Sequence, residues 1–366
     1  MADYDLLVIG SGAAGATAAT TAIHQGASRV AIVEQGILWG TCVNTGCIPS
    51  KFLLTLAEEY YYKNHGHAGL RVESNINLEE IIAEKDALIS RLKQKKTDRM
   101  VTGLGIEIIT GTAEFVAPGQ LRIGSRAVTA DRIIIATGSS PSVPPLTGLD
   151  SVPFMTNTEA LNPERIPASI IVIGGRALGL EFVQLYTHLG TNVTLLQRSS
   201  RIIPEEEPEI AELLTGYLRN EGIDIRTGVA ITGIRKTATG IEVVGTIGGI
   251  EQVFFAEHLL LTAGRSPNTR SLHLERAGVT TRPNGCACRC DAEDNNAGYL
   301  GCRGCHRRTD AGDRSPVLRG DRSPQCIWGT ETFVRSFMHP PRYLHHAAGC
   351  QCGNDGAAGP GCRPGP

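Results

Sequence analysis

Two cysteines near the amino terminus, Cys42 and Cys47, are the residues whose type and spacing are most suggestive of chemistry. They lie five positions apart in the segment 40–51, which reads Gly-Thr-Cys-Val-Asn-Thr-Gly-Cys-Ile-Pro-Ser-Lys. On the first turns of a helix two such thiols come close enough to form a disulfide, and Pro49 is tolerated at a helix start. Because the positive end of a helix favours thiolates, the sequence predicts easily ionised cysteines.

Length and charge limit the classes of protein to consider. A chain of 366 residues is long enough for two or more domains with buried cores, and its net charge of −2 argues against nucleic-acid and polybasic membrane partners. No apolar run reaches the roughly 20 residues needed to span a bilayer. The amino terminus has no basic region before its apolar run, so it predicts a strand and not a signal peptide. We therefore expect a cytoplasmic protein.

The first 34 residues contain a dinucleotide-binding fingerprint. The apolar run 4–9 is followed by Gly10-Ser11-Gly12-Ala13-Ala14-Gly15, which matches G-x-G-x-x-G. Gly10 permits the tight turn, Gly12 lets the backbone approach a pyrophosphate, and Gly15 lets the helix pack on the strand. A second apolar run ends at Glu34, where a carboxylate can accept hydrogen bonds from an adenosine ribose.

A second strand-turn-helix pattern follows at 169–181. It carries Gly174, Gly175 and Gly179, but Arg176 occupies the position that approaches the pyrophosphate. Arg176 either obstructs the phosphates or swings aside and pairs with them. Two dinucleotide-binding units in one chain indicate an electron relay between two dinucleotides.

The residues at the end of the strand 192–196 indicate which nicotinamide cofactor the chain uses. An acid there would favour the free ribose hydroxyl of NAD, whereas this chain has Gln197, Arg198 and, three residues later, Arg201. Uncharged and basic side chains favour the additional phosphate of NADP.

Together these motifs resemble the flavin-linked pyridine nucleotide-disulfide oxidoreductases, a family that includes dihydrolipoamide dehydrogenase, glutathione reductase and mercuric reductase. The resemblance extends from Asp5 to about Asn284. It implies an α/β fold with two Rossmann-like dinucleotide-binding domains of the glutathione-reductase type. The expected divisions are an FAD-binding domain with the redox disulfide (1–150), an NAD(P)-binding domain (151–270), a return toward the FAD domain (271–284) and an aberrant tail (285–366).

The resemblance also implies roles for individual residues, with FAD and NADPH as cofactors. Cys42 would exchange with substrate, Cys47 would contact the flavin, and Lys51 would pair with Glu181 across the two domains. The residues implied for FAD are Gly10, Gly12, Ala13, Ala14, Gly15, Glu34, Gly40, Thr41, Lys51, Ala113, Ala136, Thr137 and Gly138. Those implied for the nicotinamide cofactor are Gly174, Gly175, Gly179, Gln197, Arg198, Arg201 and Gly264.

Within the family, the Cys-Val-Asn segment and the stretches 181–190 and 195–199 look most like the mercuric reductases. That branch implies transient binding of Hg(II) by Cys42 and Cys47 and its reduction to Hg(0), in agreement with the preference of soft thiolates for soft metals. Dihydrolipoamide dehydrogenase or a related disulfide reductase has the same fold and a different acceptor. The sequence is also compatible with an inactive truncated product and with a metal-binding protein. The parent family is homodimeric.

The tail from Gly285 onward differs in kind from the rest of the chain. Nine of the eleven cysteines lie there, yet the apolar framework that fixes metal-ligand geometry is missing. Codons for 295–305 can be chosen that read, one base forward, Thr-Thr-Pro-Gly-Ile-Trp-Ala-Ala-Gly-Asp, which resembles the family's second flavin motif. We hypothesise a frameshift near 285–290, which would remove that motif and the dimerisation domain. It would leave an irregular, largely disordered tail and a doubtful activity.

Overall fold

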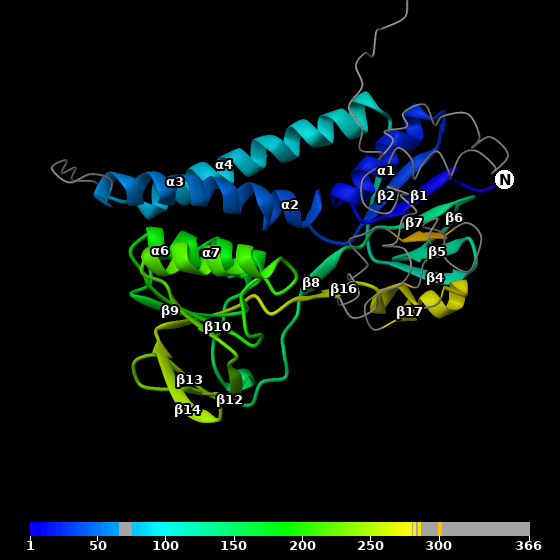
Figure 1. The fold of residues 1–366 in the computed structure, drawn as a ribbon. Helices are drawn as coiled ribbons and strands as arrows, with labels where there is room; N and C mark the ends of the chain where they lie inside the picture. The colour runs from blue at the N-terminus through cyan, green and yellow to red at the C-terminus, as the bar shows by residue number, and fades with distance from the viewer. Residues whose placement is uncertain (66–74, 280, 283–284, 287–298, 302–366) are drawn as a thin grey trace, which may run out of the picture.

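The hydrophobic runs of the sequence form the central strands of two parallel sheets. The computed structural model describes residues 1–65, 75–279, 281–282, 285–286 and 299–301. Each parallel sheet has helices on one face and a three-stranded antiparallel sheet on the other (Figure 1). The α/β fold with two Rossmann-like units is therefore confirmed, and the same three layers occur twice.

The first parallel sheet has the strand order β19-β7-β1-β2-β3. Successive side chains of a strand face opposite sides, so Leu6 and Val8 pack under the helix α1 (Ala13–His24), while Leu7 and Ile9 pack against the antiparallel sheet. The parallel strands are β1 (Leu6–Ile9), β2 (Val30–Glu34), β3 (Glu107–Thr110), β7 (Ile133–Ile135) and β19 (Tyr299–Gly301). The antiparallel strands are β4 (Ala113–Ala117), β5 (Gln120–Ile123) and β6 (Arg126–Thr129).

The second parallel sheet has the order β11-β10-β9-β15 and repeats this alternation. Ile170 and Val172 face the helices, whereas Ile171 and Ile173 face the antiparallel layer. The parallel strands are β9 (Ser169–Ile173), β10 (Asn192–Gln197), β11 (Asp224–Thr227) and β15 (His258–Leu261), and the helices are α6 (Ala177–His188) and α7 (Pro208–Asn220). The antiparallel strands are β12 (Ala230–Lys236), β13 (Ile241–Ile247) and β14 (Ile250–Ala256).

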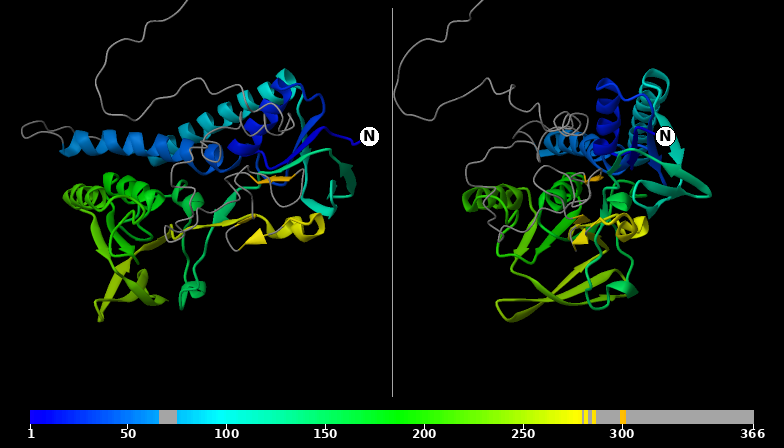
Figure 2. Two further views of the ribbon diagram at one scale, coloured as in Figure 1. Left: turned by 45° about the vertical axis from the view of Figure 1, so that its right-hand side comes forward. Right: turned by 90° about the vertical axis from the view of Figure 1, so that its right-hand side faces the viewer.

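The helices after β2 join the two units. The chain forms α2 (Gly40–Asn44), α3 (Cys47–His65), α4 (Leu78–Thr97) and a π-helical turn η1 (Asp98–Gly103). In Figures 1 and 2, α3 extends from the first unit and lies along α6 of the second, and Leu53 and Ala57 are buried in the second unit's core. The redox segment therefore begins in one unit and is held by the packing of both.

Short elements close the fold. The strand β8 (Ser139–Pro141) pairs with β16 (Arg265–Pro267), and this two-stranded ribbon connects the units (Figure 1). After β16 the chain returns to the first unit, because Leu272, Leu274 and Ala277 are buried in its core. The remaining elements are α5 (Asn157–Ala160), η2 (Leu149–Ser151), η3 (Arg270–Leu272), η4 (Leu274–Ala277), β17 (Thr281–Arg282) and β18 (Gly285–Cys286).

Two expectations about the chain as a whole concern membranes and the tail. No helix among the described residues is long and apolar enough to cross a bilayer. The predictions of a frameshift, a Cys-rich irregular tail and a missing dimer domain concern 285–366. Except for 285–286 and 299–301, that segment lies outside the described residues.

Candidate functional site: a cavity leading to the cysteine pair

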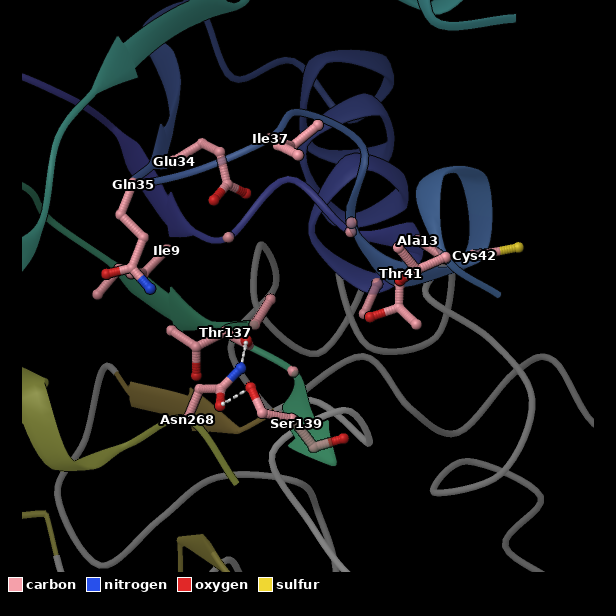
Figure 3. Close-up of a pocket in the computed structure, with 18 of the residues that line it drawn as sticks. Ile9, Ala13, Glu34, Gln35, Ile37, Thr41, Cys42, Thr137, Ser139 and Asn268 are labelled. Atoms are coloured by element: carbon pink, nitrogen blue, oxygen red, sulfur yellow. Dashed lines mark hydrogen bonds between the residues drawn. The ribbon is translucent and has the colours of Figure 1, made fainter. Parts of the chain in front are cut away.

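A cavity of about 640 Å³ lies at the carboxyl ends of the first parallel sheet's strands. In Figure 3, Glu34 and Cys42 lie on opposite sides of the cavity, and Thr137, Ser139 and Asn268 form another side. This volume is within the range of roughly 300–1,000 Å³ that is typical of small-molecule and cofactor sites. The predicted FAD residues on its wall are Gly10, Gly12, Ala13, Ala14, Glu34, Gly40, Thr41, Ala113, Ala136, Thr137 and Gly138.

Backbone constraints in the first glycine turn explain why glycines occupy it. Gly10 has a φ of +107°, and a Cβ there would come within 2.3 Å of the Ala136 carbonyl oxygen. A Cβ on Gly15 would come within 1.9 Å of the Gly10 carbonyl oxygen. Gly12 is different, because an added Cβ would meet no atom within 4 Å. The backbone at Gly12 therefore faces open space on the cavity wall, as close approach of a phosphate requires.

Glu34 fixes the turn as well as lining the cavity. Its Oε2 accepts hydrogen bonds from the Ser11 N–H at 3.0 Å and the Ser11 hydroxyl at 2.7 Å. Its Oε1 accepts one from the Gly36 N–H at 3.0 Å. The carboxylate is thus held at the strand end, where the sequence placed the ribose of a dinucleotide.

Trp39 guides the chain from β2 into the cysteine segment. Its side chain is fully buried, its N–H donates to the Ser11 hydroxyl at 2.8 Å, and its indole donates to Thr97 of α4 at 3.1 Å. Trp39 and Gly40 both have positive φ, at 77° and 64°. A Cβ on Gly40 would come within 2.7 Å of the Gly12 Cα. The two consecutive left-handed residues therefore bring α2 directly over the glycine turn.

The cysteine pair spans a break between two helices, which differs from the single helix start predicted from sequence. Cys42 lies in α2 and Cys47 begins α3. Gly46 makes this break possible, because a Cβ there would come within 2.8 Å of the Thr41 carbonyl oxygen and 3.2 Å of the Cys42 Cα. The close approach brings Cys47 near enough to affect the pKa of Cys42, and both cysteines are free. Their proximity agrees with a pair that can form a disulfide.

The two sulfurs lie in different surroundings. Cys42 is half-buried and lines the cavity, with its sulfur pointing away from the other labelled side chains in Figure 3. Cys47 is exposed and is not among the cavity-lining residues. Burial raises the pKa of the Cys42 thiol, and hydrogen bonding to Cys47 raises it further. Burial therefore opposes the easy ionisation that the sequence predicts for Cys42.

Lys96 partly offsets this effect on Cys42. Its ammonium lies 5.0 Å from the centre of the Trp39 ring, and its positive charge lowers the pKa of Cys42. Burial in turn lowers the pKa of Lys96. The sequence gives no signal for this contact, because Lys96 belongs to a run of polar residues at the end of a helix about 50 positions beyond the cysteines.

The Lys51–Glu181 pair implied by the family resemblance is present. Lys51 Nζ lies 2.5 Å from Glu181 Oε1, and the Ser50 hydroxyl is 3.4 Å from Glu181 Oε2. The pair joins α3 to α6, but its side chains are 58% and 34% exposed. At that exposure the ion pair contributes little to stability, so it serves mainly to position Lys51.

Three asparagine and arginine side chains that sequence analysis had not assigned also shape the cavity. Asn157 donates to the Thr45 carbonyl at 2.6 Å, which ties the second unit to the cysteine segment. Asn268 donates to the Thr137 carbonyl at 3.0 Å (Figure 3), and Arg265 donates to the Ser139 hydroxyl at 2.9 Å. Their positions depend on long-range packing, which local sequence patterns do not encode.

The second glycine turn has the same backbone construction. Gly174 has a φ of +118°, and a Cβ there would come within 2.7 Å of the Thr262 carbonyl oxygen. A Cβ on Gly179 would lie 1.9 Å from the Gly174 carbonyl oxygen, and one on Gly175 would press against Ile202 at 3.2 Å. Gly264, with φ of +135°, follows β15 near the connecting ribbon. These glycines allow the tight strand-to-helix turn that a dinucleotide site needs.

The side chains at the end of β10 are placed as follows. Gln197 is buried, and its Oε1 accepts a hydrogen bond from the Gly175 N–H at 2.8 Å, as Glu34 does from Ser11. Arg198 is exposed. Arg201 donates from Nη2 to the carbonyls of Pro204 and Glu206 at 2.9 and 3.2 Å. Of the two arginines expected at the ribose phosphate, Arg201 is thus held by its own loop.

The residues present fit the groups that the two fingerprints imply. In the first unit, the open face at Gly12, the cavity volume and the carboxylate of Glu34 fit a flavin adenine dinucleotide. In the second unit, the matching glycines fit a nicotinamide dinucleotide. Among the residues that the structure describes, no group of three or more His, Cys, Asp and Glu side chains could hold a metal ion. Cys42 and Cys47 are a two-sulfur pair.

Known proteins match this chain in sequence. The model of the family "Pyridine nucleotide-disulphide oxidoreductase" matches residues 4–292. The mercuric reductases of Lysinibacillus sphaericus and Staphylococcus aureus are 38% and 37% identical to this chain, each over 77% of it and 52% of the relative. The dihydrolipoyl dehydrogenase of Thermus scotoductus is 36% identical, over 76% of this chain and 61% of the relative.

A solved structure gives the same fold. The HOCl-induced flavoprotein disulfide reductase RclA from Escherichia coli superposes with a TM-score of 0.72 at 28% identity. That match covers 82% of this chain and 65% of RclA. The chain spans about half the length of the mercuric reductases it resembles.

Proposed function

Because the chain belongs to the pyridine nucleotide-disulphide oxidoreductase family, we propose that it is a flavoprotein oxidoreductase that passes electrons from NADPH to the Cys42–Cys47 pair. The supporting observation is the continuous cavity that runs from Glu34 at one end to Cys42 at the other. Its preferred acceptor is Hg(II), in line with the mercuric reductase relatives. NADPH use places the reaction in the cytoplasm.

The first unit holds the flavin. The backbone at Gly12 and the start of α1 receive the pyrophosphate, and Glu34 receives the adenosine ribose. Ala113 also lies on the cavity wall, and Ala136 to Gly138 leave room because their side chains are small. When bound, FAD takes two electrons from the nicotinamide and supplies them to a disulfide. Lys51, positioned by Glu181, provides positive charge beside that group.

The cysteines divide the remaining chemistry. The family resemblance assigns Cys47 to the flavin and Cys42 to the acceptor. In this structure, by contrast, Cys42 lines the cavity and Cys47 does not. Lys96 favours the Cys42 thiolate, and two thiolates bind a soft ion such as Hg(II). Overall, NADPH is oxidised to NADP+ with release of a proton, and two electrons convert Hg(II) to Hg(0).

The test measures NADPH oxidation by the purified full chain supplied with FAD, with Hg(II) or lipoamide as the acceptor. We expect Hg(II)-dependent oxidation that falls to background in the C42S/C47S double variant, which keeps the other nine cysteines. If the double variant oxidises NADPH with Hg(II) as fast as the parent, the assignment of these two cysteines fails.

A second candidate, dihydrolipoamide dehydrogenase, is supported by the Thermus scotoductus relative at 36% identity. It shares the fold and the electron path and differs in the acceptor. Faster NADH or NADPH oxidation with lipoamide than with Hg(II) would favour it over the mercuric reductase proposal.

A further inference from the structure

The loop after β10 lies against the second glycine turn. Ile202 is fully buried against Gly175, and the Ile203 N–H donates to the Gly175 carbonyl at 2.8 Å. Ile203 itself has a φ of +35°, an unusual value for a branched side chain. Together with the bonds from Arg201 to Pro204 and Glu206, these contacts hold the loop in one conformation. This conformation places the side chain of Glu205, which follows Pro204, beside Arg176 of the second glycine turn.

Arg176 occupies the counterpart of Gly12. The two residues precede their helices with nearly the same extended backbone, φ −60° and ψ −176° at Gly12 and φ −92° and ψ 177° at Arg176. At Gly12 an added side chain would enter open space on the cavity wall. The Arg176 side chain therefore leaves the backbone toward the side from which a dinucleotide's phosphates approach the second turn.

The guanidinium of Arg176 is already occupied by a carboxylate. It forms an ion pair with Glu205, and the two side chains are 51% and 38% exposed. A guanidinium binds a carboxylate and a phosphate with the same planar set of donors, so the two acceptors compete for it. A half-exposed pair is weakly held and screened by salt, so Arg176 can exchange its partner at little cost.

We propose that Glu205 is an internal competitor for the dinucleotide's pyrophosphate, and that Arg176 transfers from Glu205 to that pyrophosphate when the nicotinamide cofactor binds. The inference rests on the proposed function, because it assumes that the second unit binds a nicotinamide dinucleotide. Without ligand, Glu205 neutralises the charge that the turn would otherwise present to any anion. Because the pyrophosphate must displace Glu205 from Arg176, this competition lowers the affinity of the second unit for the cofactor. It therefore favours release of the cofactor after each turnover.

The test is a comparison of dissociation constants for NADPH and NADH, measured by calorimetric titration of the full chain. E205Q removes the competing charge and should tighten binding by roughly threefold, the scale of an exposed ion pair. E206Q is the matched control: it makes the same charge change in the same loop, and its side chain makes no ion pair among the described residues. It should change binding by less than E205Q does.

Arg176 variants separate a direct contact from a general charge effect. R176A should weaken binding, and R176A/E205Q should bind like R176A alone. ADP, which has the diphosphate, should gain from E205Q, whereas adenosine 2′-monophosphate should not. Circular dichroism checks folding, and R176K provides a charge-retaining variant.

The inference is overturned if E205Q and E206Q behave alike, if E205Q acts equally in the R176A background, or if R176A tightens binding. It is also overturned if both adenosine phosphates respond equally. These outcomes leave cofactor binding itself intact. If neither NADPH nor NADH binds to the parent or to any variant, the proposed function fails together with the inference.

Discussion

The two strand-turn-helix units, 6–34 and 169–197, share their backbone but differ in the side chains that face the ligand. Gly10 and Gly174 both have positive φ, and a Cβ on Gly15 or on Gly179 would meet a carbonyl oxygen at 1.9 Å. Gly12 is replaced by Arg176 in the second unit, and Glu34 by Gln197. Positions that close the turn are thus fixed by sterics, whereas positions that face the ligand vary and decide what is bound and how tightly.

The layers around the two turns agree as well. Each parallel sheet buries alternate residues under helices and against an antiparallel three-stranded sheet. The first unit, however, has the cysteine segment packed over its turn, with Gly40 against Gly12. The second has a loop that presents Glu205 to its turn. We interpret the first unit as built to retain its cofactor and the second as built to exchange it.

The largest expected effect is on folding, from G15A and G179A. Each added methyl group would clash with a backbone carbonyl oxygen, so each should destabilise its unit by about 3 kcal/mol, the upper range of overpacking. Urea denaturation measures the loss. G12A is the matched control, since its methyl group would meet nothing within 4 Å. Equal stability of G12A and G15A would contradict the steric account of the turn.

Next in size is a change of cofactor preference in Q197E, which makes the second strand end like the first. A carboxylate there accepts hydrogen bonds from a free ribose hydroxyl and repels a ribose phosphate. We expect the ratio of NADPH to NADH affinity to fall about tenfold, or about 1.4 kcal/mol. Fluorescence titration with both cofactors measures it. An unchanged ratio of NADPH to NADH affinity would show that the side chain at position 197 does not contact the ribose.

A smaller effect is expected from D5N, at the start of β1. Hydrogen bonds from the backbone and side chain of Arg29, and from Ser28, hold the pKa of Asp5 well below its usual range. Because the pKa of Asp5 is lower in the folded than in the unfolded protein, its ionised form stabilises the fold at pH values above the unfolded pKa of about 4. This stabilisation is lost as the pH falls from that value through the folded-state pKa.

D5N should therefore cost about 1 kcal/mol at pH 7, because solvent screening reduces the contribution of a partly exposed charged group to about that of an ordinary hydrogen bond. The difference from the parent should shrink in urea denaturations carried out below pH 4. A penalty that stays constant with pH would mean that the charge of Asp5 is not what stabilises the strand.

The smallest effect is on thiol reactivity, in K96M. Because the Lys96 charge lowers the pKa of Cys42, its removal should raise that pKa and slow alkylation of Cys42 below the pKa. The rate of iodoacetamide labelling of Cys42, followed against pH by peptide mass, reports the change. K95M alters a neighbouring exposed lysine and is the control. Faster labelling in K96M would contradict the proposal that the Lys96 charge lowers the pKa of Cys42.

The sequence predicted those parts of the site that depend on local backbone geometry. The glycines of both turns, Glu34 and Gln197 follow from the spacing of strand, turn and helix. In each unit the structure places the turn beside the side chain that ends the second strand, Glu34 in the first and Gln197 in the second. The break between α2 and α3 was missed, because it depends on Gly46 packing against Cys42.

Contacts between distant segments could not be predicted in the same way. Lys96 reaches Trp39 only after α4 folds back along the cysteine segment, and Asn157 reaches Thr45 only when the units pack. Arg201 was expected at a phosphate, but its loop turns back so that its guanidinium satisfies carbonyls of Pro204 and Glu206. Such contacts are set by tertiary packing, which patterns of a few residues do not specify.

The most direct test of the account is the redox state of Cys42 and Cys47, read from the tryptic peptide 30–51, which holds both and no other cysteine. The full chain is oxidised, supplied with FAD, treated with NADPH under anaerobic conditions and then alkylated. We predict that the oxidised peptide carries an internal disulfide and takes up two alkyl groups only after NADPH has been added. A peptide that is alkylated equally with and without NADPH, or that never forms the disulfide, would contradict the electron path proposed for this protein.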